Sequence, residues 1–110
     1  MPHANRGDVW LADLGLAAKV RPVLILSVPY SDHDYALYGV VPHTTTPRGS
    51  DFEVELSVRG LKSGAFNVQG LLSVPPARLI RKLTKLMPEQ MSSIENVVRT
   101  WLGLEFLGHS

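Results

Sequence analysis

A change of hydrophobic period at Pro88 constrains the fold of this chain more than any other feature of its sequence. From Met91 to Leu102, apolar residues recur at spacings of three and four, which is one face of an amphipathic helix. Pro88 suits the first helical position and Gly103 suits a C-terminal cap, although Met87 is a poor N-cap, so that fraying is expected there. The sequence therefore predicts a mainly β domain that ends in a C-terminal α-helix.

Before Pro88 the chain reads as five or six short strands. Each is an apolar or alternating run bounded by Gly, Pro, Ser or Asp, at 7–14, 20–28, 35–42, 51–58 and 65–74. The 51–58 run alternates strictly, and Gly70 in the longest run predicts a β-bulge. Residues 75–78 can form one helical turn, and 79–86 a turn or short strand. A flat sheet of this size would leave exposed edges, so we expect a small, strongly curved antiparallel barrel with the helix beside it.

The composition is that of one ordinary globular domain, here 1–110, because 110 residues suffice for one core and not for two. The net charge of +1 neither indicates nor excludes a nucleic-acid partner, since basic patches can lie within a neutral total. The absence of cysteine excludes disulfides and thiolate zinc sites. With no secretory signal and no apolar run of about 20 residues, a cytoplasmic protein without membrane contact is expected.

The sequence contains none of the common motifs for metal, cofactor or covalent chemistry. The histidines, His3, His33, His43 and His109, form no i, i+4 pair. The chain also lacks GxxxxGK[ST], GxGxxG and GxSxG. We therefore expect neither a metal site nor a cofactor.

The segment 40–49, VVPHTTTPRG, gathers hydroxyls, an imidazole and a guanidinium. If the strand continues, Thr44 and Thr46 share one face, whereas His43 and Thr45 point the other way, so the cluster acts together only if the chain bends. The threonines are equally compatible with a simple strand end, since threonine has high β-propensity.

Arg21 stands beside Pro22 at the start of an apolar strand. It is either a solvated charge or a well-held guanidinium fork for a phosphate. Tyr30 and Tyr35, in a turn region, are mostly core candidates that could stack on a base.

Four segments in this order give the chain a resemblance to the MazF/PemK toxins of type II toxin–antitoxin systems. They are RGDVWLADL (6–14), VRPVLILS (20–27), VVPHTTTPRGSDFEVEL (40–56) and PEQMSSIENVVRTWLGL (88–104), so the resemblance covers the core 6–104. It implies an SH3-like barrel of the CcdB/PemK/MazF type, a homodimer, and a cognate antitoxin that covers the active groove. It also implies metal-independent cleavage of single-stranded RNA, usually mRNA.

The resemblance places the family's catalytic arginine on Arg21 and its catalytic threonine on Thr44. Thr45, Thr46, Arg48 and Gln69 are then candidate RNA contacts, and Lys19 and Lys62 could follow the RNA backbone by charge. Two features depart from the family. The 15–19 loop is short, and Gln69 and Leu72 stand where an acidic and a basic residue are usual.

The expected reaction is attack of the ribose 2′-OH on the adjacent phosphorus, which leaves a 2′,3′-cyclic phosphate. General base and acid stay unassigned: His43 and His33 have usable pKa values, but alternation turns His43 away and His33 lies in a loop. Two alternatives stay open: a CcdB-like toxin that binds DNA gyrase, and a non-catalytic SH3-like binding module.

Overall fold

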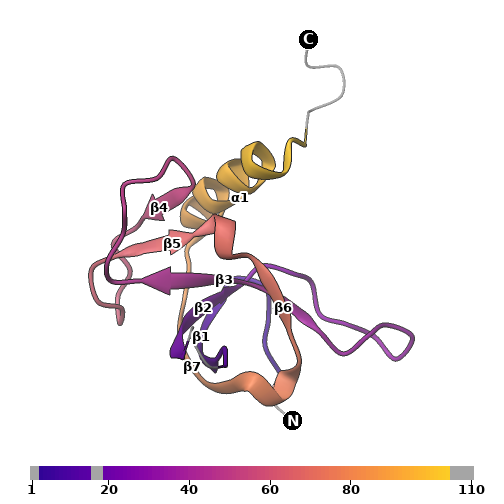
Figure 1. Ribbon diagram of the computed structural model, residues 1–110. Helices are drawn as coiled ribbons and strands as arrows, with labels where there is room; N and C mark the ends of the chain where they lie inside the picture. The colour runs from indigo at the N-terminus through magenta and orange to yellow at the C-terminus, as the bar shows by residue number, and fades with distance from the viewer. Residues whose placement is uncertain (1–2, 16–18, 105–110) are drawn as a thin grey trace.

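The computed structural model describes residues 3–15 and 19–104 of the chain (Figure 1). The strands are β1 (Asp8–Asp13), β2 (Val20–Ile25), β3 (Tyr38–Thr44), β4 (Glu53–Glu55), β5 (Ala65–Asn67), β6 (Leu72–Val74) and β7 (Leu79–Lys85). The 3₁₀ turns η1 (Val68–Gly70) and η2 (Pro76–Arg78) flank β6, and the helix α1 (Pro88–Leu102) follows β7. The predicted mainly β architecture with a C-terminal helix is confirmed.

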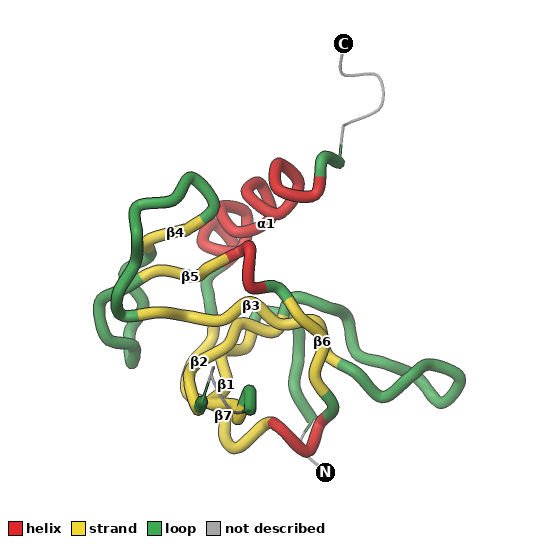
Figure 2. Tube along the Cα trace, in the orientation of Figure 1, coloured by secondary structure: helices red, strands yellow, loops and turns green. Residues whose placement is uncertain are grey.

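The strands form a curved antiparallel sheet in the order β4-β5-β3-β2-β1-β7 (Figure 2). β3 is its central strand, because it pairs with β2 along one edge and with both β5 and β6 along the other. The ladders among the described residues run as an open path from β4 to β7. Antiparallel pairing and curvature agree with the sequence, and closure into a barrel stays a prediction.

Both faces of the central strands are buried, because alternate side chains enter two separate cores. The core under α1 contains Val9, Leu24, Val41, Met91 and Ile94. The core on the opposite face contains Trp10, Val23, Val40, Tyr38 and Leu79. Successive side chains of β1 to β3 therefore point into two different apolar layers. Because both faces are closely packed, these strands are a rigid support.

The predicted single strand at 65–74 is wrong, because η1 divides it. The side chain of Asn67 accepts a hydrogen bond from the Gln69 N–H at 3.2 Å, which gives the backbone an alternative to the ladder. Gly70 marks a close approach to β3 rather than a bulge, since a Cβ there would lie 2.8 Å from Pro42 Cγ. The break turns the following strand, so that β5 and β6 pair with different halves of β3.

The other predicted strands are present, but their boundaries differ from those predicted from the sequence. β3 covers 38–44 rather than 35–42, β2 ends at Ile25, and only 53–55 of the predicted 51–58 strand is paired. Residues 79–86, for which the sequence allowed a turn or a short strand, contain the full strand β7, which pairs with β1. The helical turn predicted at 75–78 is present as η2. The 15–19 loop falls partly on residues 16–18, outside the described residues.

Both ends of α1 are held by identifiable groups. At the start, the Met87 N–H donates to Gln90 Oε1 at 2.8 Å, while Gln90 Nε2 donates to the Ser57 carbonyl at 3.0 Å. Gln90 thus satisfies the backbone N–H of Met87 and ties the helix start to Ser57, whereas Met87 supplies no side-chain cap. At the end, Gly103 adopts the predicted left-handed cap with φ of 68°.

The RGD stretch at 6–8 has structural contacts. Arg6 pairs with Glu95 of α1 and donates to the Leu26 carbonyl at 2.9 Å. Gly7, with φ of 96°, donates to the Ile25 carbonyl at 2.8 Å. Asp8 is buried, 3.3 Å from Lys82 Nζ. Residues 6–8, which belong to the first segment of the family resemblance, therefore connect β1 with α1, β2 and β7.

Candidate functional site

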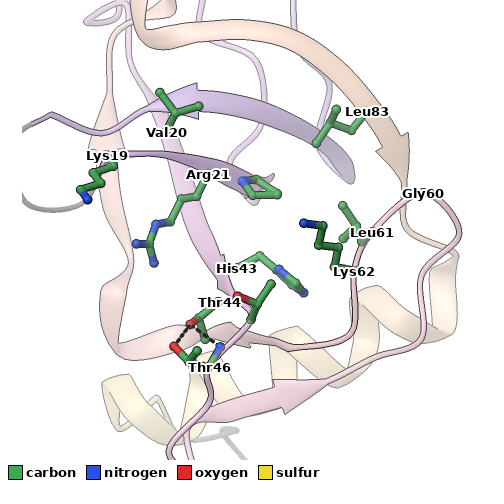
Figure 3. A pocket seen from close by; sticks show the side chains of 12 residues that line it. Lys19, Val20, Arg21, His43, Thr44, Thr46, Gly60, Leu61, Lys62 and Leu83 are labelled. Atoms are coloured by element: carbon green, nitrogen blue, oxygen red, sulfur yellow. Dashed lines mark hydrogen bonds between the residues drawn. The ribbon is translucent and has the colours of Figure 1, made fainter.

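A groove lies over the C-terminal end of β3 and is made of two adjoining hollows. The first, of about 420 Å³, extends from β2 to the 60–62 loop (Figure 3). The second, of about 430 Å³, extends towards η1 and the 48–53 loop. Arg21, Thr44 and Thr46 line both hollows and so lie at their junction.

Arg21 and Thr44 lie on neighbouring strands at the same end of the β2–β3 ladder. The ladder ends at Val23 and Pro42; Arg21 precedes it by two residues on β2, Thr44 follows it by two residues on β3, and both line the two hollows. Both residues are half-buried, and the Arg21 side chain extends from β2 towards the threonines (Figure 3). A guanidinium and a hydroxyl are thus presented together by two rigid strands.

The three threonines lie together because the chain bends after Thr44. The Thr46 N–H donates to Thr44 Oγ1 at 3.1 Å, and the two hydroxyl oxygens are 3.3 Å apart (Figure 3). This hydroxyl turn brings Thr44, Thr45 and Thr46 into the wall of the first hollow. Thr44 Oγ1 accepts from the backbone, which leaves its own hydrogen for Thr46 or for a ligand.

His43 points into the core, as alternation predicts, but it also lies in the same wall. The residue is 3% exposed, and its ring centroid lies 5.0 Å from that of Phe66 in an edge-to-face arrangement. The ring nevertheless lines the first hollow together with Thr44, and its burial lowers the pKa of the imidazole below the ordinary value.

Gly64 allows the 59–64 loop to pass directly over this strand end. A Cβ at Gly64 would lie 2.0 Å from the Thr44 carbonyl oxygen and 2.9 Å from His43 Cε1. Only a residue without a side chain fits here, because the nearest atom belongs to the backbone of β3. The loop also carries Lys62, which completes the far wall of the first hollow.

Arg48 enters the second hollow from a loop that Glu53 holds in place. The Glu53 carboxylate accepts N–H bonds from Arg48 at 3.0 and 3.1 Å, from Gly49 at 2.8 Å and from Ser50 at 2.9 Å. These backbone bonds, with that of Arg48 foremost, lower the pKa of Glu53. The sequence argument missed this role, although the spacing Ser50-x-x-Glu53 resembles that of a capping box.

Gln69 of η1 occupies the position where the family pattern has an acid. It is exposed and lines the second hollow, as does Asn67 at the end of β5, which the sequence argument missed. Leu72 instead packs against the core opposite α1. Of the two positions that differ from the family pattern, Gln69 therefore lies in the groove, whereas Leu72 is partly buried against a core.

The groove is cationic and contains every predicted site residue. Thr45 lines the first hollow, Arg48 and Gln69 line the second, and Arg21, Thr44 and Thr46 line both. Lys19 and Lys62 add charge to the first hollow, which no carboxylate among the described residues lines, whereas Glu53 lines the second. Such a lining suits a polyanionic backbone. The catalytic and RNA-binding roles of these residues stay predictions.

The predicted aromatic platforms lie elsewhere. Tyr30 packs edge-on against Tyr38 at 5.3 Å, and Tyr35 is 88% exposed on the loop between β2 and β3. Neither residue lines the groove. Over residues 3–15 and 19–104, no three His, Asp or Glu side chains gather as a metal site would require, and no helix is long and apolar enough to span a bilayer.

Together, the curved antiparallel sheet, the single helix and the cationic, hydroxyl-lined groove define a small β protein suited to hold a phosphodiester. Residues 5–102 match the family described as PemK-like, MazF-like toxin of type II toxin-antitoxin system. Because the match covers nearly the whole chain, this protein belongs to that toxin family, and the predicted family is confirmed.

Solved structures agree with this assignment. The chain is similar to an endoribonuclease in complex with its cognate antitoxin from a mycobacterial species, with 27% identity, a TM-score of 0.80, and coverage of 94% of this chain and 99% of that one. It is also similar to Mycobacterium tuberculosis toxin MazF-mt6, with 27% identity, a TM-score of 0.76, and coverage of 90% and 99%. A MazE-MazF structure from Deinococcus radiodurans, 20% identical over 96% and 100% with a TM-score of 0.79, shares the fold.

Proposed function

We propose that this toxin is an endoribonuclease that cleaves single-stranded RNA, with mRNA as its usual substrate. The observation that carries the proposal is the placement of Arg21 and Thr44 together at the junction of the two hollows, which Lys19, Lys62 and Arg48 also line. Family membership and the similarity to chains described as endoribonucleases support the same reading.

The proposed reaction is intramolecular. The ribose 2′-oxygen attacks the adjacent phosphorus, the bond to the 5′-oxygen breaks, and a 2′,3′-cyclic phosphate and a 5′-hydroxyl result. Charge develops on the non-bridging oxygens, where Arg21 can donate two parallel N–H bonds and Thr44 one O–H. One such preorganised donor typically stabilises a transition state by about 3–4 kcal/mol. This chemistry uses no metal and no cofactor.

RNA contacts on either side of the scissile phosphate would come from the two hollows. Lys19, Lys62 and Arg48 can neutralise backbone phosphates, which makes affinity salt-dependent. Unstacked bases would be read by hydrogen bonds, for which the amide of Gln69 and the hydroxyls of Thr45 and Thr46 are available.

Regulation by a second protein completes the proposal. We infer a homodimer and a cognate antitoxin whose acidic, extended tail occupies the groove and blocks RNA. The positive lining of the groove and the complex with a cognate antitoxin described for the mycobacterial relative support this inference.

The test is incubation of purified protein with single-stranded RNA in EDTA, with the termini analysed by mass spectrometry. We expect defined cuts that carry cyclic phosphate ends, and a fall in rate of about 10²–10³-fold for Arg21→Ala, the loss typical of one donor. Intact RNA together with poisoning of DNA gyrase would favour the CcdB-like reading. Intact RNA without any effect on gyrase would favour a binding module.

A further inference from the structure

We propose that His43 is the general base that takes the proton from the attacking 2′-hydroxyl. The proposal rests on the RNA-cleaving function proposed above and names the catalytic group that the sequence leaves unassigned. It starts from the observation that His43, although it points into the core, lines the same hollow as Thr44.

The position of His43 is defined by packing rather than by hydrogen bonds. Its ring meets Phe66 at 5.0 Å with an interplanar angle of 70°, and Gly64 passes close to its Cε1 atom. Among the described residues, no hydrogen bond to a ring nitrogen of His43 is found, and neither nitrogen is fully enclosed without a partner in the way that Asp8 Oδ1 is. The imidazole is therefore held in one place beside Arg21 and Thr44 while its nitrogens stay available for proton exchange.

Burial favours the neutral form of His43 and lowers its pKa, so the imidazole is unprotonated near neutral pH. Lys19 and Arg21 line the hollow from the β2 side and Lys62 from the 59–64 loop, and no carboxylate among the described residues lines it. Glu55 of β4 is exposed and lines a separate hollow. A neutral imidazole is the form that can accept a proton.

The proposed step balances as follows. One nitrogen of His43 takes the 2′-hydroxyl proton while the 2′-oxygen bonds to phosphorus. The bond between phosphorus and the 5′-oxygen then breaks, and that oxygen takes a proton from water. The hydroxide so formed is neutralised when His43 releases its proton to solvent, which regenerates the neutral imidazole.

The experiment is a profile of kcat/KM against pH, from 4.5 to 8.5, for the wild-type protein, His43→Ala and His43→Gln. For the wild type we expect a rate that falls on the acidic side, with a midpoint below about 6.5, the ordinary histidine pKa. For both variants we expect kcat to fall by about 10²–10⁴-fold and the acidic limb to disappear. Free imidazole should restore part of the rate of His43→Ala, in which the space for the ring is empty.

Two controls separate catalysis from folding and binding. His33→Ala removes an exposed histidine of the β2–β3 loop, outside both hollows, and should keep the wild-type profile. An oligonucleotide with a 2′-deoxyribose at the cleavage site should bind the His43 variants within about threefold of the wild type, because a general base adds little to ground-state binding.

The outcomes distinguish this inference from the function on which it rests. If the wild type cleaves RNA and His43→Gln keeps its rate and acidic limb, His43 is not the base and the nuclease proposal stands. If the wild type cleaves no RNA, both proposals fall. If both variants fail to fold by circular dichroism, the wild-type profile decides, because a rate without an acidic limb overturns the assignment.

Discussion

Replacement of Gly64 by alanine tests whether the groove depends on the close approach of the 59–64 loop to β3. The added Cβ would lie 2.0 Å from the Thr44 carbonyl oxygen, 3.0 Å from its carbonyl carbon and 2.9 Å from His43 Cε1. Two of these atoms belong to the backbone of a central strand and cannot rotate away. The loop or the strand end must therefore shift by a sizeable fraction of an ångström.

The magnitude follows from the nature of that contact. Overpacking a well-packed site usually costs about 1–3 kcal/mol, and a clash with backbone belongs at the upper end of that range or above. A loss of about 3 kcal/mol lowers Tm by roughly 12 °C or more in a domain of this size. RNA cleavage should fall as well, because the displaced atoms belong to Thr44 and His43.

The assay is thermal and urea unfolding followed by circular dichroism, with cleavage rates measured well below Tm. Gly49→Ala is the matched control: it adds the same methyl group with nothing within 4 Å, at a φ of 82°. That conformation alone should cost about 1–2 kcal/mol. If Gly64→Ala is no less stable than Gly49→Ala, the loop is free to move and the reasoning is refuted.

Four further predictions concern the site and the core. Thr44→Val should lower kcat by about 10²–10³-fold; full cleavage would make the threonines an ordinary strand end. Glu53→Gln should raise KM for RNA with kcat little changed, because a neutral amide holds the 48–50 backbone less strongly; Glu55→Gln, at an exposed neighbour, should match the wild type in the same steady-state assay. Ile94→Ala should cost about 2–5 kcal/mol in urea unfolding, and a smaller loss would mean that the core under α1 collapses around the gap. The free energy of unfolding should fall as pH drops through about 6.5, the ordinary histidine pKa, and on towards the lower pKa of the folded chain, since the unfolded chain binds the proton of His43 more tightly than the folded chain; a His43→Gln variant with the same slope would contradict this.

Much of the fold could be predicted because local patterns and tertiary demands agree. The apolar face from Met91 onwards, the cap at Gly103 and the alternation in β1 to β3 all match the structure. The failures occur where a tertiary contact overrides a local pattern. The apolar run at 65–74 reads as one strand, but the Asn67 side chain and the approach of Gly70 to Pro42 break it.

The residues of the candidate site were likewise predictable only in part. Arg21, Thr44 and Gln69 could be chosen from motifs, and the groove contains all three. Gly64 could not, because its contribution is a close approach to the backbone of β3, about twenty residues earlier in the chain. No periodicity records such a contact. Glu53 and Asn67 bind backbone N–H groups within five residues, so a local signal existed for them and was missed.

By itself, the sequence determined the element types, the mainly β architecture with its closing helix, and the residues able to bind a phosphate. Those properties follow from period, capping and side-chain chemistry, which are local. The tertiary structure alone decided which of these residues meet. The β2–β3 pairing places Arg21 and Thr44 at the same end of the two strands, the bend after Thr44 gathers the threonines, and the missing side chain of Gly64 lets the 59–64 loop lie against Thr44 and His43. Register, bends and close approaches depend on segments distant in sequence, so only the folded chain specifies them.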